Sequence, residues 1–257
     1  MDLTIHHGSD AGLSREIRVD ISHADVEAMR SLLRAGARTG NEQPGVDVHL
    51  DDIVPKPWGL EYRAYVDDFL DVWQLQVDVG HTTSMHNHPR KLTYLVCLAG
   101  EGVLSTLTDE FPVRTGDVVR IAKGSFHSTR NASATDRLDL IEVEAPRNKY
   151  DLLRLRDGYA RARLGYESGS QVGPTRMRRL PYLPYAFMRS GSPCGRYQFD
   201  VIAGMDLYYR GLGLAELLVP LGIENLAFDN VHVLSRYASP DRAPQLDSYY
   251  LGVRLVD

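Results

Sequence analysis

Two stretches of the chain carry the fold signal: GHTTSMHNHPRKLTYLVCLAG at residues 80–100 and GDVVRIAKGSFHSTRN at residues 116–131. The first places His86 and His88 two residues apart. In an extended segment such residues point to the same face, so both imidazoles can bind one metal ion. The second stretch adds His127. Three histidines from two strands predict a metal site that keeps coordination positions open, as catalytic sites do.

Short strand-like runs surround these histidines, at residues 73–79, 93–100, 102–107, 117–124 and 139–146. In the first run, apolar and polar residues alternate, which predicts a half-buried strand. Gly, Pro, Asp or Asn bounds each run, as at strand ends. Many short strands without helices between them favour an antiparallel sandwich or barrel of the jelly-roll type.

The flanking regions differ from this core. Residues 15–21 alternate and predict a strand, and Ser22 with Asp25 resembles a capping box that opens a helix. Gly36 is a plausible stop for that helix. Residues 147–185 show no sustained period and predict an irregular connection or cover. Further strands are expected at residues 196–204, 226–235 and 248–256, either extending the first sheet or forming a degenerate second barrel.

The chain therefore divides into three segments. Residues 1–53 form an N-terminal strand-helix segment, residues 54–146 the barrel, and residues 147–257 an Arg-rich connection with a β-rich C-terminal extension. We expect an all-β protein in which the mouth of the barrel is the active site.

Composition excludes several classes of protein. The chain has 257 residues, 43% hydrophobic and 25% charged, with a formal net charge of −5. These values are those of a globular protein and do not favour nucleic-acid or anionic-membrane binding. Cys97 and Cys194 lie far apart, which predicts neither a disulfide nor a thiolate zinc site, and Cys97 is expected to be a buried, inert thiol. We expect a cytoplasmic protein that neither spans nor binds a membrane.

The two histidine stretches resemble the two motifs of the cupin superfamily. The first motif has the form G-x5-H-x-H-x3,4-E-x6-G and the second G-x5-P-x-G-x2-H-x3-N. Eight positions of this chain agree with them, namely Gly80, His86, His88, Gly100, Gly116, Gly124, His127 and Asn131. The resemblance implies a cupin jelly-roll barrel with one divalent metal ion at His86, His88 and His127.

Two motif positions depart from the pattern. Thr93 stands at the glutamate position and Ala122 at the proline position. Proline mainly stiffens a turn, so its loss matters little. Without the glutamate, three neutral imidazoles leave the charge of a divalent ion uncompensated, which favours an anionic or bidentate oxygen ligand from a small-molecule substrate. Water, Glu142 or Glu144 could also fill the vacant position.

A narrower resemblance comes from KPWGLEYRAYV at residues 56–66 and LIEVEAP at residues 140–146, which are similar to segments of type II mannose-6-phosphate isomerases and related sugar-handling cupins. The resemblance implies isomerisation or epimerisation of a sugar phosphate or nucleotide sugar. The base that such a reaction needs could be His81, Lys91 or Glu61. The metal (Fe, Zn, Mn or Ni) stays open, and cupins often pair, so a homodimer is also possible. We interpret the PWG triplet at residues 57–59 first as a turn, with Trp58 as an apolar plug at one end of the barrel.

Charge is distributed unevenly along the chain. Residues 147–179 hold nine basic and three acidic residues. Such an excess suits a phosphate or carboxylate site, but we interpret it first as a solvated arginine face paired with acids elsewhere. We assign contact with a substrate anion to Arg90 and Lys91, beside the histidine pair. Two other functions remain open: an iron(II) dioxygenase with a three-histidine site, and a sugar-binding cupin without catalysis.

Overall fold

Short β-strands make up most of the structure, a computed structural model that describes residues 15–43, 45–162, 164–167, 189–191, 197–210, 217–221, 234–235 and 246–256. Seven of them form one large sheet in the order β1-β9-β6-β11-β4-β3-β2. Their bounds are β1 (Glu16–Val19), β2 (Val54–Lys56), β3 (Gly59–Val66), β4 (Asp71–Val77), β6 (Leu92–Ala99), β9 (Val118–Ile121) and β11 (Leu138–Ala145). β1 runs parallel to β9, and the other pairs are antiparallel.

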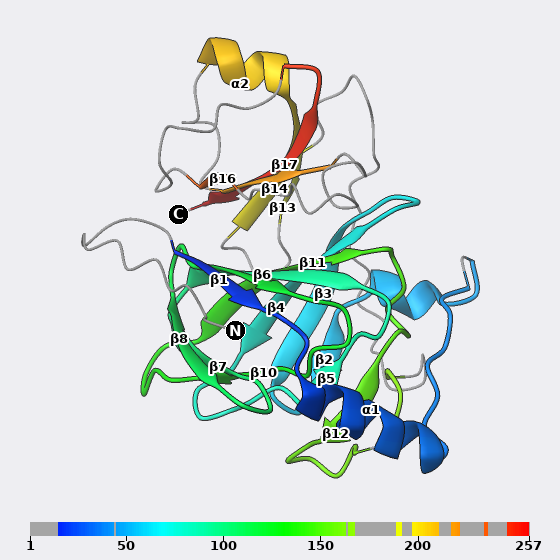
Figure 1. Ribbon diagram of the computed structural model, residues 1–257. Coiled ribbons are helices and arrows are strands. Elements are labelled where there is room, and N and C mark those ends of the chain that lie inside the picture. Colours follow the sequence, from blue (N-terminus) through cyan, green and yellow to red (C-terminus); the bar gives the residue numbers. More distant parts are fainter. Residues whose placement is uncertain are drawn as a thin grey trace.

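Shorter strands close the barrel opposite the large sheet. One group has the order β10-β7-β8 and the other pairs β12 with β5. A β-bridge between His86 and His127 joins the two groups. The strand bounds are β5 (Met85–Asn87), β7 (Glu101–Ser105), β8 (Glu110–Arg114), β10 (Ser128–Asn131) and β12 (Leu153–Arg156). Figure 1 shows these layers facing each other, which confirms the all-β jelly roll.

The alternating runs of the sequence all correspond to strands, and the strands that they miss have a physical reason. β3 carries charged Glu61 and Arg63 on its inward face, both buried. Leu60, Tyr62 and Ala64 alternate with these charges, but they pack in the apolar cluster on the outer face of the barrel, so the usual polarity of the two faces is reversed in β3. The barrel also takes in β1 and β12, which lie outside the segment of residues 54–146.

A second sheet covers the outer face of the barrel. Within the described residues it has the order β13-β14-β17-β15-β16 and carries the short helix α2 (Gly204–Arg210). Its strands are β13 (Arg189–Gly191), β14 (Tyr197–Ala203), β15 (Leu217–Pro220), β16 (Leu234–Ser235) and β17 (Tyr249–Leu255). Phe199 and Leu251 of this sheet share one apolar cluster with Tyr94 and Ile141 of the barrel. The C-terminal region thus forms a separate layer, and neither extends the barrel sheet nor closes a second barrel in the part described (Figure 1).

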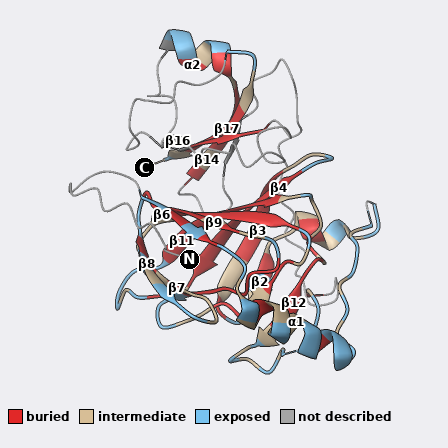
Figure 2. Cartoon of the chain, in the orientation of Figure 1, coloured by how far each residue is buried: buried red, intermediate tan, exposed pale blue. Residues whose placement is uncertain are grey.

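This covering sheet corrects the expectation of a half-buried strand at residues 73–79. Every residue of β4 is buried, including Gln74 and Gln76 on its outer face (Figure 2). Trp73 and Leu75 face the barrel interior, whereas Val72 packs in the cluster shared with the second sheet. Alternation in β4 therefore marks two buried faces of different polarity.

The N-terminal helix forms as its capping signal predicts. Ser22 caps α1 (His23–Arg34): the backbone N–H of Asp25 donates to its hydroxyl and its own N–H donates to the Asp25 carboxylate. Asp25 also accepts from the backbone N–H of Phe126, which ties the helix start to the barrel. Gly36 follows the helix with φ +92°. A 3-10 turn, η1 (Val48–Asp51), leads into β2.

Part of the predicted irregular cover is ordered on the barrel. β12 pairs with β5 next to His86, and residues 157–162 and 164–167 continue beside it. The remainder of that prediction, with Arg176, Arg178 and Arg179, lies outside the described residues, as do His6, His7, His232 and Cys194. None of the helices in the described part of the chain combines the length and apolarity needed to cross a membrane.

A glycine in the β2–β3 turn tests the packing of this barrel. Gly59 has φ +143°, and a Cβ there would lie 1.9 Å from the carbonyl oxygen of Gln76. We expect Gly59→Ala to lower the free energy of unfolding by about 2–4 kcal/mol, because it adds both strain and a backbone clash. Urea denaturation measures the change. Gly158→Ala is the control, since a Cβ at residue 158 would have nothing within 4 Å; equal midpoints for the two variants would contradict the expectation.

Candidate metal centre

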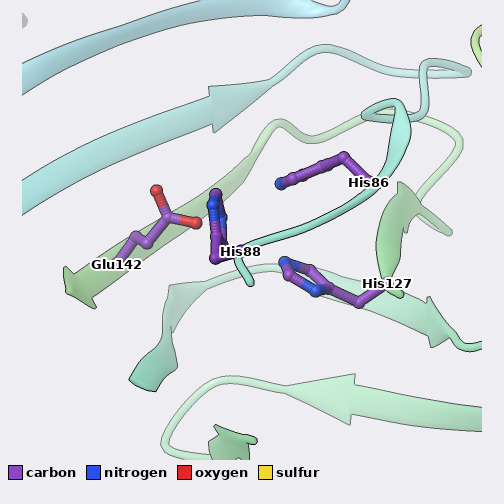
Figure 3. Close-up of side chains that lie close together, drawn as sticks. All are labelled: His86, His88, His127 and Glu142. Carbon is purple, nitrogen blue, oxygen red and sulfur yellow. The ribbon is translucent and has the colours of Figure 1, made fainter. Parts of the chain in front are cut away.

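Backbone pairing brings the three motif histidines together. His86 lies in β5, His88 follows that strand, and His127 directly precedes β10. The N–H of His86 donates to the carbonyl of His127 at 3.1 Å, and the reverse bond measures 2.8 Å. The ring centroids lie 4.6–5.6 Å apart. Residues distant in sequence therefore meet in one cluster, and Figure 3 shows the side chains turned toward one another.

Each imidazole is held in one orientation by a backbone carbonyl. The Nδ1 of His86 bonds Ser84 O at 2.8 Å, that of His88 bonds Asp151 O at 2.8 Å, and that of His127 bonds Ser125 O at 3.1 Å. A carbonyl only accepts, so Nδ1 carries the proton and the Nε2 lone pair is free. The Nε2 atoms of His88 and His127 are buried and have no hydrogen-bond partner. This arrangement is that of imidazoles prepared to bind a metal.

The protein environment keeps these imidazoles neutral. Burial lowers the pKa of His127 to about 4. Burial, reinforced by nearby positive charges, also holds the pKa of His86 and His88 well below its usual value. Only the neutral ring offers a lone pair to a metal. At neutral pH all three rings are therefore in the state that binds.

Glu142 supplies the carboxylate that the first motif lacks. Ligand atoms of His86, His88, His127 and Glu142 all lie within 4.8 Å of one another. Thr93, at the motif's glutamate position, pairs across β6 and β11 with Glu144, and Glu142 is the next inward residue of β11. The carboxylate of the cluster therefore lies on β11, next to the strand that carries the motif position. A set of three nitrogens and one carboxylate oxygen fits a divalent transition ion.

Glu144, unlike Glu142, forms an ion pair with Lys91. Its Oε1 accepts from Lys91 Nζ at 2.5 Å and lies 3.3 Å from His88 Nε2. Lys91 and Glu144 are both fully buried, so each charge depends on the other for compensation. Of the two acids that the sequence leaves open, Glu142 belongs to the cluster and Glu144 forms an ion pair beside it.

Lys149 joins the acids of the interior. Its Nζ lies 3.0 Å from Glu142 and 3.6 Å from both Glu61 and Glu144. Burial disfavours its charge, but these carboxylates raise the pKa of Lys149 well above its usual value. Burial and the neighbouring acids raise the pKa of Glu142 to about 7, although Lys149 opposes the shift. Lys149 thus holds the acidic residues together at the cluster.

A small cavity adjoins the four residues. Its volume is about 40 Å³, room for a few water-sized groups and far below the roughly 300 Å³ of ordinary ligand pockets. Four cationic and two anionic side chains line it, namely Lys56, Lys149, Arg154, Arg161, Glu61 and Glu142. Trp58 also lines the cavity and is buried, as expected of an apolar plug. A much larger groove, about 730 Å³, has none of the four cluster residues in its lining.

The three proposed bases are each already engaged. His81 Nδ1 lies 3.0 Å from the hydroxyl of Tyr159, away from the cavity. Lys91 is paired with Glu144. Glu61 does line the cavity; although burial opposes the shift, Lys149 and Lys56 lower the pKa of Glu61 to about 2.

Arg90 and Lys91, which we expected to contact a substrate anion, are engaged in other interactions. Arg90 is half exposed, and its guanidinium donates to Asp151 at 2.9 Å and to Thr39 at 3.0 Å. It does not line the cavity, and neither does Lys91. Cys97 is buried, and burial raises the pKa of its thiol to about 12, which confirms the inert thiol.

The arginine-rich stretch is in part a cover of the site. Lys149 and Arg154 are nearly fully buried and point inward, so a solvated face is the wrong description of this part. Lys149 pairs with Glu142, seven residues earlier on β11, and with Glu61 on the distant strand β3, whereas Arg154 pairs with Glu167. The available signal was LIEVEAP, which puts two acids two residues apart on one face of a strand.

One family of known proteins matches part of the barrel. Residues 73–144 match the cupin domain family. No curated protein matches the chain. Among solved structures, the chain is similar to the oxalate decarboxylase of Lactobacillus farciminis in its formate complex, with 17% identity, 40% of this chain and 33% of that chain covered, and a TM-score of 0.36. It is also similar to KdgF from Halomonas sp., with 15% identity and a TM-score of 0.34; the match covers 36% of this chain and 84% of KdgF.

The chain spans about a third of the length of the Lactobacillus enzyme. The family match itself runs from β4 to β11 and includes all four residues of the histidine and glutamate cluster. Together with the jelly-roll order of the strands, this match supports a cupin domain over residues 73–144.

Proposed function

We propose that this chain is a metal-dependent enzyme for a small, anionic, oxygen-rich substrate. The observation that carries the proposal is the convergence of three neutral, carbonyl-oriented imidazoles with Glu142 in the barrel interior. A divalent ion at His86, His88, His127 and Glu142 would polarise a carbonyl or hydroxyl oxygen of the substrate. The excess of cationic side chains around the cavity favours an anion.

Isomerisation or epimerisation of a sugar phosphate or nucleotide sugar is the reaction that the sequence resemblance implies. The chain's own part would be to position the sugar oxygens beside the cluster and to exclude water, which the buried lining of Trp58, Leu75 and Leu95 supports. A sugar phosphate exceeds the cavity, so the cover must shift to admit it.

A second candidate, an iron(II) dioxygenase, is favoured by one observation. The side chains considered as bases are engaged in hydrogen bonds or ion pairs, and the pKa of about 2 makes Glu61 a weak base. Reaction of a bound substrate with dioxygen does not require a side-chain base at that place. A binding cupin without catalysis is the remaining alternative.

Metal content is the first test. We expect the purified chain to hold near-stoichiometric divalent metal and a His86→Ala/His88→Ala variant to lose it, because two of the four ligands are gone. His23→Ala is the matched control, since His23 is exposed at the start of α1. Elemental analysis measures the ion. Absence of metal after reconstitution with Fe, Zn, Mn and Ni would contradict the enzyme proposal and favour a binding cupin without catalysis.

Substitution can distinguish the roles of Glu142 and Glu144. We expect Glu142→Gln to weaken metal affinity by at least about tenfold, since even outer partners of a metal site contribute roughly 10–100-fold. Glu144→Gln should instead lower the free energy of unfolding by about 3 kcal/mol, because it leaves Lys91 buried without its partner. Metal titration and urea denaturation of both variants measure these effects. A larger loss of metal affinity in Glu144→Gln would reverse the assignment.

Oxygen consumption separates the two reaction classes. With iron(II) loaded, a dioxygenase is expected to take up dioxygen only when substrate is present, and His86→Ala/His88→Ala should abolish the uptake. An isomerase is expected to interconvert aldose and ketose phosphates without uptake. An oxygen electrode and proton NMR on a panel of sugar phosphates and small carboxylates record both.

A further inference from the structure

The carboxylate of Glu167 lies among three cationic side chains. Lys56 Nζ donates to its Oε2, Arg161 Nη1 donates to its Oε1 at 2.5 Å, and Arg154 Nη2 lies 3.7 Å from Oε1. The side chains of Lys56, Arg154 and Arg161 are 4%, 3% and 13% exposed, and that of Glu167 is 7% exposed. We call these three residues the cation cluster. Burial at this level makes charge compensation obligatory.

The cation cluster belongs to the same cavity as the histidines. Lys56, Arg154 and Arg161 all line it. Arg154 Nε donates to the hydroxyl of Ser84 at 3.2 Å, and that hydroxyl lies 3.4 Å from His86 Nδ1. An anion bound to the cluster would therefore lie beside the metal-binding residues.

Glu167 is the carboxylate on which Arg154 depends. The other contacts of Arg154 within the described residues are neutral: its guanidinium donates to the carbonyls of Leu164 and Gly165 at 3.0 Å. Lys56 and Arg161 have further acidic partners in Glu61 and Asp157. If Glu167 leaves, the cluster keeps an uncompensated positive charge. A planar guanidinium with a lysine beside it suits a carboxylate or phosphate group.

The size of the cavity requires such a departure. About 40 Å³ cannot hold a substrate of more than a few atoms. Glu167 belongs to the cover, in the segment that follows β12. Moving residues 164–167 outward, while β12 and Arg161 stay in place, enlarges the cavity and withdraws the Glu167 carboxylate in one step, and an incoming anion can then replace it.

We infer that Lys56, Arg154 and Arg161 are an anion-binding subsite beside the histidine cluster, and that Glu167 occupies it in place of the substrate's carboxylate or phosphate. Glu167 acts as an internal competitor: its carboxylate occupies the subsite in the closed state, and residues 164–167 move away when the ligand anion takes that position. The inference rests on the proposed function for the identity of the ligand, but the anion subsite itself can be tested without a reaction.

Titration with inorganic phosphate tests the subsite. Isothermal calorimetry at constant ionic strength compares the wild-type chain with Glu167→Gln, with Lys56→Met/Glu167→Gln and with the control Glu27→Gln, which removes an exposed glutamate paired with Arg30. We expect Glu167→Gln to bind phosphate at least about fivefold more tightly than wild type, because the competing closed state no longer lowers the apparent affinity. The double variant should lose this binding, and Glu27→Gln should match wild type.

Two results would contradict the inference. Equal or weaker phosphate binding by a folded Glu167→Gln would overturn the competition, and phosphate binding that persists in Lys56→Met/Glu167→Gln would overturn the subsite. If Glu167→Gln does not fold, Glu167→Asp keeps the charge but shortens its reach, and it should shift affinity in the same direction. Metal content is measured on every sample, with a repeat after chelation. Normal metal content without a phosphate response rejects this inference alone, whereas loss of metal in the wild type rejects the proposed function.

Discussion

Lys149 Nζ lies between Glu142 at 3.0 Å and Glu61 and Glu144 at 3.6 Å, in the interior of the barrel. Charges at this depth are tolerated only when they are paired. The acids come from β3 and β11, but Lys149 comes from the segment that follows the barrel. The cover must therefore fold onto the barrel mouth for the interior to be neutralised. Closure of the site and stability of the barrel thus depend on the same ion pairs.

The acid beside the three histidines stands at a different position from the motif's glutamate. In this chain the glutamate position of the first motif is Thr93, and the carboxylate comes from Glu142 on the neighbouring strand. Inward-facing residues of adjacent antiparallel strands lie close to one another, so an acid on β11 can reach the point that an acid on β6 would serve. The three imidazoles are unaffected, because backbone carbonyls hold them.

The second sheet accounts for the unusual burial of the barrel. Its apolar face packs on β3, β4, β6 and β11, so these strands are covered on both sides. Polar residues on the covered face need partners: Tyr62 donates to Gln74, and Tyr197 of the second sheet donates to Asp139 at 3.0 Å. A sequence pattern that usually marks a solvent-facing side here marks an internal layer joined by hydrogen bonds.

The sequence by itself determined the jelly roll, the capped helix and the three histidines. Those features depend on local periodicity and on spacing within one or two strands, which one stretch of chain records. Only the tertiary structure decided that Glu142 joins the cluster, that Lys149 and Arg154 face inward, and that both faces of β4 are buried. Each of these depends on which distant segment packs against which. Sheet stacking and the Glu61–Lys149 ion pair are properties of that packing, and no short window of sequence contains both partners.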